Sequence, residues 1–143
     1  MIVIDANLFL YAYNADAPQQ RAASEWLTGL VASRETIALP WVTIWAFIRL
    51  STNSRIWNQP LPAERAFAIV DEWLSLSDVV VIQPGPRHLE LLKQLVITHN
   101  AGGPLVSDAV LAALAIENGA LLASTDQDFS RFKGLQWINP LSQ

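Results

Sequence analysis

The chain contains no cysteine and only two histidines. The lack of cysteine excludes disulfide bonds and thiolate metal sites, and it fits a reducing compartment. Charged residues are scarce as well, at 15% of the 143 residues, whereas an average soluble domain has about 25%. The formal net charge is -4, so the basic footprint typical of nucleic-acid-binding domains is absent. Any contact with a nucleic acid must therefore come from a local site.

Long uninterrupted apolar runs are also missing. A helix needs about 20 apolar residues to cross a bilayer, and Asp108 and Glu117 interrupt the longest candidate. The first residues have no basic start and carry Asp5 and Asn7 within the apolar run, which is not the pattern of a signal peptide. We therefore expect a soluble, cytoplasmic protein. A chain of this length forms a single core, so one domain over residues 1–143 is expected.

Apolar residues are abundant instead, at 52% of the chain with six tryptophans. One explanation is an apolar surface that a second copy of the chain covers, and on this basis we expect at least a dimer. The alternative is a tryptophan-rich core. It would place all six of these side chains inside: Trp26, Trp41, Trp45, Trp57, Trp73 and Trp137.

Short apolar runs alternate with helical patterns along the chain. Strands are expected at 2–4, 36–39, 79–82, 120–123 and 135–138. Helices are expected at 8–13, 18–32, 41–52, 62–76 and 87–99, in the run that follows Asp108, and as a short turn at 128–132. This alternation predicts an α/β fold with a central parallel sheet of four to five strands and helices on both faces. The proline-containing loop at 53–62 predicts that the helices beside it form a projecting hairpin.

Four aspartates stand at the ends of these elements. Asp5 follows the first strand, Asp108 lies at the start of an alanine-rich helix, and Asp126 and Asp128 follow the strand at 120–123. Taken singly, each is explained by helix capping, because aspartate accepts hydrogen bonds from the N–H groups at a helix start. Taken together, they are expected on one edge of the sheet, where helix starts and the carboxyl ends of parallel strands meet.

Carboxylates gathered at one edge raise one another's pKa unless a cation lies between them. Hard oxygen ligands, with no cysteine and no clustered histidine, favour magnesium, with manganese as the second choice. Such a site suits the hydrolysis of phosphodiester bonds. Asn7 and Ser124 are candidates for orienting Asp5 and Asp126, and local backbone hydrogen bonding is their alternative. Arg49 is a candidate for binding phosphate, although a solvated arginine is common.

Four segments carry a resemblance to a known family. They are IVIDANLFLYA at 2–12, AFIRLSTN at 46–53, GPRHLELL at 85–92 and SDAVLAALAIENGALLASTDQDF at 107–129. In this order they resemble the PIN-domain ribonucleases, and within them the VapC toxins of toxin–antitoxin pairs. The resemblance implies a PIN-like, Rossmann-like three-layer fold. It also implies a metal-dependent endoribonuclease, usually a dimer, that inhibits translation by cutting RNA and is held inactive by a VapB-type antitoxin.

The resemblance also implies roles for individual residues. Asp5, Asp108 and Asp126 correspond to the catalytic, metal-binding acids, with Asp128 as a further acid beside the metal. Asp5 and Asp108 would anchor the ion, and Asp126 would help position the attacking water. An antitoxin peptide is expected along the groove near these acids.

The chain departs from the family pattern at one position. Many members have a glutamate before the Phe-x-Arg of the third helix, and here that position is Ala46. A catalytically weak PIN domain that binds RNA or protein is therefore the alternative function. The sequence leaves open which RNA is cleaved, how many metals bind and which antitoxin pairs with the chain.

A receiver-like signalling domain is a third interpretation, since it shares the parallel sheet and an acidic edge. It requires an aspartate after a middle strand and a lysine after a late one. Asp78 precedes its strand, and neither Lys93 nor Lys133 is suitably placed, so the sequence favours the first two interpretations.

Overall fold

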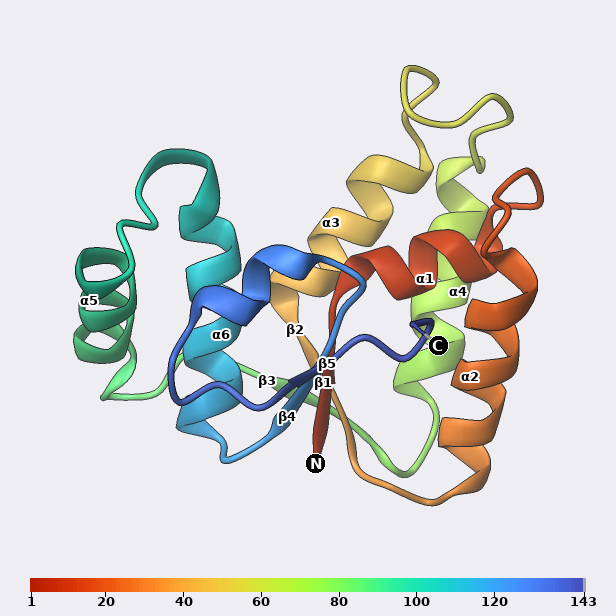
Figure 1. Ribbon diagram of the computed structural model, residues 1–143. Coiled ribbons are helices and arrows are strands. Elements are labelled where there is room, and N and C mark those ends of the chain that lie inside the picture. Colours follow the sequence, from red (N-terminus) through yellow and green to blue (C-terminus); the bar gives the residue numbers. More distant parts are fainter. Residues whose placement is uncertain (143) are drawn as a thin grey trace.

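A parallel five-stranded sheet forms the centre of the computed structural model, which describes residues 1–142 (Figure 1). Its strands are β1 (Ile2–Ile4), β2 (Ile37–Pro40), β3 (Val79–Ile82), β4 (Leu121–Ala123) and β5 (Trp137–Ile138). Their spatial order is β3-β2-β1-β4-β5, so β1 is the middle strand, with β2 and β3 on one side and β4 and β5 on the other. The expected α/β fold is confirmed. The strand order reverses between β1 and β4, which is where open sheets of this kind form ligand sites.

The strands are short and apolar because both faces of the sheet are covered. In β1, Ile2 and Ile4 belong to the core on one face, and Val3 belongs to the core on the other. Val3 is aligned with Ala38 of β2 and Leu122 of β4. The three residues have no exposed surface, so the sheet is held from both sides at this level.

One layer of helices packs on the face of Ile2 and Ile4. It consists of α1 (Ala6–Tyr13), α2 (Gln20–Ala32), α3 (Trp41–Ser51) and α4 (Ala63–Leu74). Phe9 makes edge-to-face contacts with Phe47 and Trp73, at ring-centre distances of 6.3 and 5.0 Å. These aromatic pairs join α1 to α3 and α4, and the latter two form the expected hairpin (Figure 1).

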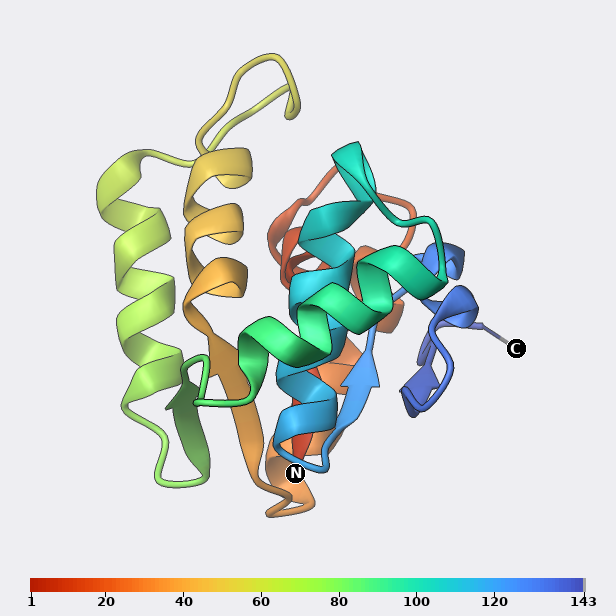
Figure 2. The ribbon, with the colours of Figure 1, turned by 90° about the vertical axis from the view of Figure 1, so that its left-hand side faces the viewer.

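The second layer covers the face of Val3. It consists of α5 (His88–Thr98), the 3₁₀ turn η1 (Gly103–Leu105), α6 (Val106–Glu117) and the 3₁₀ turn η2 (Gln127–Arg131). In Figure 2, α5 lies across α6. Ala109, Ala112 and Ala113 have no exposed surface, so the backbone of α6 lies close to the sheet. Gly119 then ends this segment with a positive φ of 60°, which glycine adopts without strain.

Two expectations from the sequence need correction. Element boundaries differ by a few residues: α1 begins at Ala6 and β5 contains only Trp137 and Ile138. A core holding all six tryptophans is wrong, because Trp41 is 40% exposed and Trp45 is 63% exposed. The buried side of α3 instead carries small and branched residues together with Phe47, and the two tryptophans stack on each other outside.

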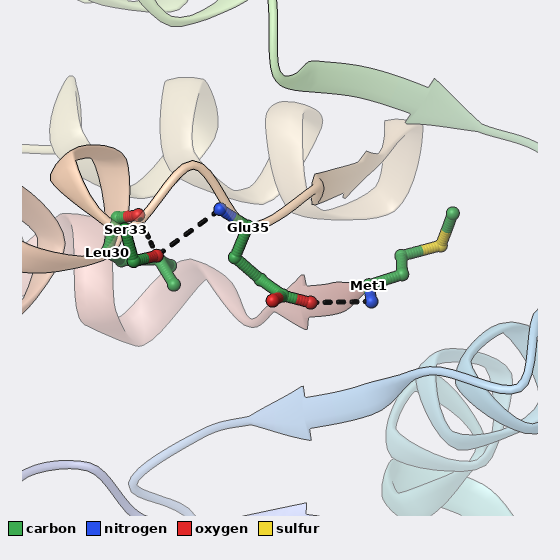
Figure 3. A network of polar contacts seen from close by, with 4 residues as sticks. All are labelled: Met1, Leu30, Ser33 and Glu35. Carbon is green, nitrogen blue, oxygen red and sulfur yellow. Dashed lines mark hydrogen bonds and ion pairs between the residues drawn. The ribbon is translucent and has the colours of Figure 1, made fainter.

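The amino-terminal end of the sheet is tied by surface hydrogen bonds (Figure 3). The amino group of Met1 donates to Oε1 of Glu35 at 2.7 Å, and the backbone N–H of Glu35 donates to Oγ of Ser33 at 3.3 Å. The Ser33 hydroxyl donates to the carbonyl of Leu30 at 2.6 Å. This network joins the start of β1 to the turn between α2 and β2.

Across residues 1–142, no helix is both long enough and apolar enough to span a membrane.

Candidate metal centre

The candidate site lies at the carboxyl ends of the neighbouring strands β1 and β4. Asp5 directly follows β1, and its N–H donates to the carbonyl of Ala123 at 3.0 Å. Ser124 directly follows β4, and its N–H donates to the carbonyl of Ile138 at 3.0 Å. The hydrogen-bonding pattern of the sheet thus continues into the site and fixes the backbone of both residues.

Asp5 is held at both carboxylate oxygens. Oδ1 accepts the N–H of Ala6 at 2.7 Å, so Asp5 caps α1, and Oδ2 accepts the hydroxyl of Ser124 at 2.6 Å. Burial raises the pKa of Asp5, these two hydrogen bonds oppose the rise, and the charge of Asp126 adds to it. The hydrogen bonds from Ala6 and Ser124 therefore stabilise the charged form of Asp5, whereas desolvation and the charge of Asp126 destabilise it more.

Ser124 is the centre of the hydrogen-bond network. Its side chain has no exposed surface, and its Oγ accepts from Nδ2 of Asn7 and from the N–H of Asp126, each at 3.1 Å. Together with the bond to Asp5, these contacts use the one donor and both acceptor sites of a hydroxyl. Nε1 of Trp137 also donates to the Ser124 carbonyl at 3.0 Å. Sequence reasoning selected Asn7 and Ser124 but missed Trp137, which nothing in the local pattern marks.

Three further carboxylates lie together in front of this network. Asp108, Asp126 and Asp128 can each offer an oxygen within 4.8 Å of the others. Desolvation, followed by the charges of Asp126, Asp5 and Asp128, raises the pKa of Asp108 to about 6, and Arg131 opposes the shift. The four acids expected on one edge thus lie close enough to affect one another's charge.

Capping explains only two of the four acids. Asp5 caps α1, and Asp126 caps η2 by accepting the N–H of Asp128 at 2.9 Å. Asp108 lies inside the first turn of α6 and not at its cap, because the preceding 3₁₀ turn places Leu105 there.

Asp128 pairs with Arg131 instead. Nη2 of Arg131 lies 3.4 Å from Oδ1 of Asp128, and its Nε donates to the Asp128 carbonyl at 3.2 Å. Arg131 was missed as part of this cluster, although its spacing of three residues from Asp128 would allow contact in a helical turn. Within residues 1–142, Arg131 is the residue that forms an ion pair with one of these four acids.

A cavity of ≈ 270 Å³ opens beside Asp5 and Asp108. The rest of its wall comes from the start of α1, from α3 and from α6, and it includes Trp45, Ala46 and Arg49. Thr43 holds α3 against the sheet, because its Oγ1 donates to the carbonyl of Ile4 at 2.9 Å. Ala46 and Arg49 thus line the same cavity as Asp5 and Asp108.

The donor set fits a hard divalent cation. Asp108, Asp126 and Asp128 can each offer an oxygen to one ion, Asp5 lies beside them, and burial and mutual repulsion raise the pKa of Asp5 and Asp108. A bound cation would relieve this repulsion, and oxygen ligands are those preferred by magnesium and manganese.

Comparison with known proteins places these features in context. The PIN domain family model matches residues 2–135. Ribonuclease VapC37 of Mycobacterium tuberculosis is 37% identical over 140 residues, covering 98% of this chain and 97% of that protein. Ribonuclease VapC33 of the same organism is 38% identical over 143 residues, covering 100% of both chains.

Solved structures share the fold. VapC20 of Mycobacterium tuberculosis, described as a toxin that cleaves the sarcin–ricin loop, has a TM-score of 0.68 at 20% identity over 95% of this chain and 99% of its own. VapBC2 from Rickettsia felis, bound to a DNA fragment from its promoter, also has a TM-score of 0.68 at 20% identity, over 97% and 98% of the two chains.

Proposed function

The chain belongs to the PIN-domain family, within its group of VapC ribonucleases, and we propose that it is a metal-dependent endoribonuclease. It would be the toxin of a VapBC-type pair and would inhibit translation by hydrolysing phosphodiester bonds of RNA. The observation that carries this proposal is the cluster of Asp108, Asp126 and Asp128 beside the partly buried Asp5. Its position at the strand-order reversal and the named relatives support the same function.

Magnesium is the proposed cofactor, with manganese as the alternative. Asp5, Asp108, Asp126 and Asp128 would hold it, and when bound it would supply a Lewis acid that polarises the phosphate and lowers the pKa of water. Asp126 is proposed to orient the attacking water. Asn7 and Ser124 keep Asp5 in place through the hydrogen bonds described above.

Arg49 is proposed to bind the phosphate of the substrate. It lines the cavity next to Asp5 and Asp108, and it forms no ion pair with any residue in the described part of the chain. A guanidinium can donate two parallel hydrogen bonds to a phosphate, so Arg49→Lys should bind RNA less well than the wild type.

Substitution of single acids tests the function. Asp5→Asn and Asp108→Asn keep the side-chain shape and remove one ligand charge each, so RNA cleavage should fall by about 10²-fold or more in protein that remains folded by circular dichroism. Asp71→Asn, at an exposed position on α4, is the matched control. Full activity in either folded variant, or in the wild type with excess chelator, contradicts the proposal.

A VapB-type antitoxin is the proposed protein partner. The cavity beside Asp5 and Asp108 would take a segment of this partner, which would exclude RNA from the carboxylates. The solved VapBC complexes with the same fold support a partner of this class. Co-expression with the antitoxin gene should suppress RNA cleavage, and cleavage by the purified complex at the rate of the free protein would contradict it.

A homodimer is the proposed assembly. Large apolar side chains on α3 and α5 are exposed. Trp45 is 63% exposed, Leu89 77% and Ile97 69%, so their burial against a second copy of the chain would be favourable. Light scattering should give twice the chain mass, and a monomer at high concentration would contradict the assembly.

Ala46 favours a second candidate, a catalytically weak domain that binds RNA or protein. It lines the cavity and offers no carboxylate. Calorimetric metal titration combined with an RNA cleavage assay of the wild type and Ala46→Glu separates the two functions. A binding module takes up no metal and cleaves no RNA in either form. The nuclease binds metal and cleaves RNA as the wild type.

A further inference from the structure

A second hollow, of ≈ 430 Å³, begins at Asn7. Its walls are the end of α1, the loop after α1 and the loop after α3, which Figure 1 draws in red-orange and yellow at the upper right. Asn7 links the hollow to the metal centre, because it donates to Ser124 and Ser124 donates to Asp5. A molecule in this hollow would therefore lie within two hydrogen bonds of a proposed metal ligand.

The lining of the hollow combines amide groups with apolar surface. Its carboxamide side chains are Asn7, Asn14, Gln19 and Asn58. Tyr11 and Ile56 supply aromatic and apolar surface, and Asp16 is its one charged residue among those in the described chain. Because the lining has a carboxylate and no lysine or arginine, it does not suit a phosphate.

A nucleobase matches this chemistry. Its flat faces are apolar and its edge carries hydrogen-bond donors and acceptors, and a carboxamide offers both a donor and an acceptor to such an edge. Single-stranded RNA is recognised in this way, by bases that are stacked on aromatic side chains and hydrogen-bonded along their edges. Among residues 1–142, the carboxamides of Gln19 and Asn58 have no hydrogen-bond partner within the protein, so they are free to read a base.

Both loops that form the hollow are held by hydrogen bonds. Oδ1 of Asn14 accepts the N–H of Asp16, and the Asn14 carbonyl accepts the N–H of Ala17, each at 3.1 Å. In the other loop, Trp57 is only 5% exposed and its N–H donates to the carbonyl of Asn53 at 3.0 Å. The walls are thus largely formed before a ligand arrives, which lowers the entropic cost of binding.

We propose that this hollow binds one base of the RNA strand beside the bond that is cut, with Gln19 and Asn58 reading its edge. The hollow thereby sets the base preference of the nuclease at one position. This inference rests on the proposed function, since RNA is the substrate. The metal centre would then cut the strand at a fixed distance from the recognised base.

Two exposed positions allow a test that leaves the metal centre intact. Gln19→Ala and Asn58→Ala each remove one carboxamide from the hollow, and Gln136→Ala, exposed and outside it, is the matched control. Each protein digests the same pool of random-sequence RNA, and the new ends are sequenced. Loss of one base contact worth about 1–3 kcal/mol reduces discrimination at a single position by about 5- to 150-fold. The control should keep the wild-type profile, and an unchanged preference at every position in both variants overturns the inference.

Binding separates this inference from the proposed function. The Asp108→Asn variant, with and without Asn58→Ala, is titrated with labelled oligonucleotides of A, C, G or U, and affinity is followed by fluorescence anisotropy. If the affinities for the four oligonucleotides differ and Asn58→Ala removes these differences, base recognition in the hollow is supported even if the wild type cleaves nothing. Equal affinities for all four, or the same ranking in both proteins, overturn it. Weaker antitoxin binding with unchanged base preference also overturns it, because the hollow would then be a protein-binding site.

Discussion

Ser124 donates its hydroxyl hydrogen to Oδ2 of Asp5 over 2.6 Å and thereby joins the ends of β4 and β1. Oγ of Ser124 also accepts from Nδ2 of Asn7 and from the N–H of Asp126, so one hydroxyl connects both sides of the candidate metal centre. The fold and the site are thus coupled at the strand-order reversal.

Ser124→Ala tests this coupling. Loss of the hydroxyl leaves Oδ2 of Asp5, Nδ2 of Asn7 and the N–H of Asp126 each without this partner in a partly buried place, so we expect the free energy of unfolding to fall by about 1–3 kcal/mol. The pKa of Asp5 should rise further, since the Ser124 hydrogen bond lowers it. Chemical denaturation measures the first effect, with the exposed Ser130→Ala as control. Equal stability of the two variants would contradict the central role of Ser124.

Metal binding should depend on pH through Asp108. Its pKa is raised to about 6, and a metal needs the deprotonated carboxylate, so affinity should increase as the pH rises from 5 to 7. Calorimetry at both pH values should also detect proton release on binding at the lower one. Asp108→Asn removes this titration, so an equally steep pH dependence in that variant would contradict the assignment.

The stability of the metal-free protein should decrease as the pH rises, whereas the metal affinity increases. A carboxyl whose pKa is raised on folding binds protons more tightly in the folded state, so between its ordinary value and about 6 stability falls as the pH rises. We expect denaturation of the metal-free protein to need more urea at pH 5 than at pH 7. Excess magnesium should reduce this difference, and the Asp108→Asn variant should show less of it.

Ala46→Glu tests the cavity next to the acids. The added carboxylate would share a cavity with Asp5 and Asp108, so the metal-free variant should melt at a lower temperature than the wild type. Magnesium or manganese should raise the melting temperature of this variant by more than that of the wild type. Ala46→Gln has nearly the same shape without the charge and should not gain this metal response. Equal responses in the two variants would show that position 46 does not reach the metal.

Substitution of the exposed apolar side chains should affect assembly. Trp45→Ser combined with Leu89→Ser removes large apolar groups that are already in solvent, so the fold should persist while the dimer dissociates. Phe67→Ser is the control, because Phe67 is 53% exposed on α4. If light scattering gives the same dimeric mass for the double variant and the control, the dimer interface lies elsewhere.

The sequence predicts the sheet and the grouping of acids because both follow from chain order. A β-branched run ending at Asp5 and an apolar strand ending at Ser124 were enough to place two carboxyl ends on one edge. The pairing of Asp128 with Arg131 could not be predicted in the same way, because it depends on how η2 turns. Apolar periodicity marks helix α3 but does not say which apolar stripe faces the core, so the exposure of Trp45 was not predictable.

The hydrogen bond between Asp5 and Ser124 joins residues that are 119 positions apart. During synthesis of the chain, Asp5 is therefore produced 119 residues before the hydroxyl that holds it. Until residues 124 to 128 have emerged, a nascent chain has β1 without β4 beside it and two of the four acids are missing. The proposed metal site would thus assemble only after both segments have been made and have folded together.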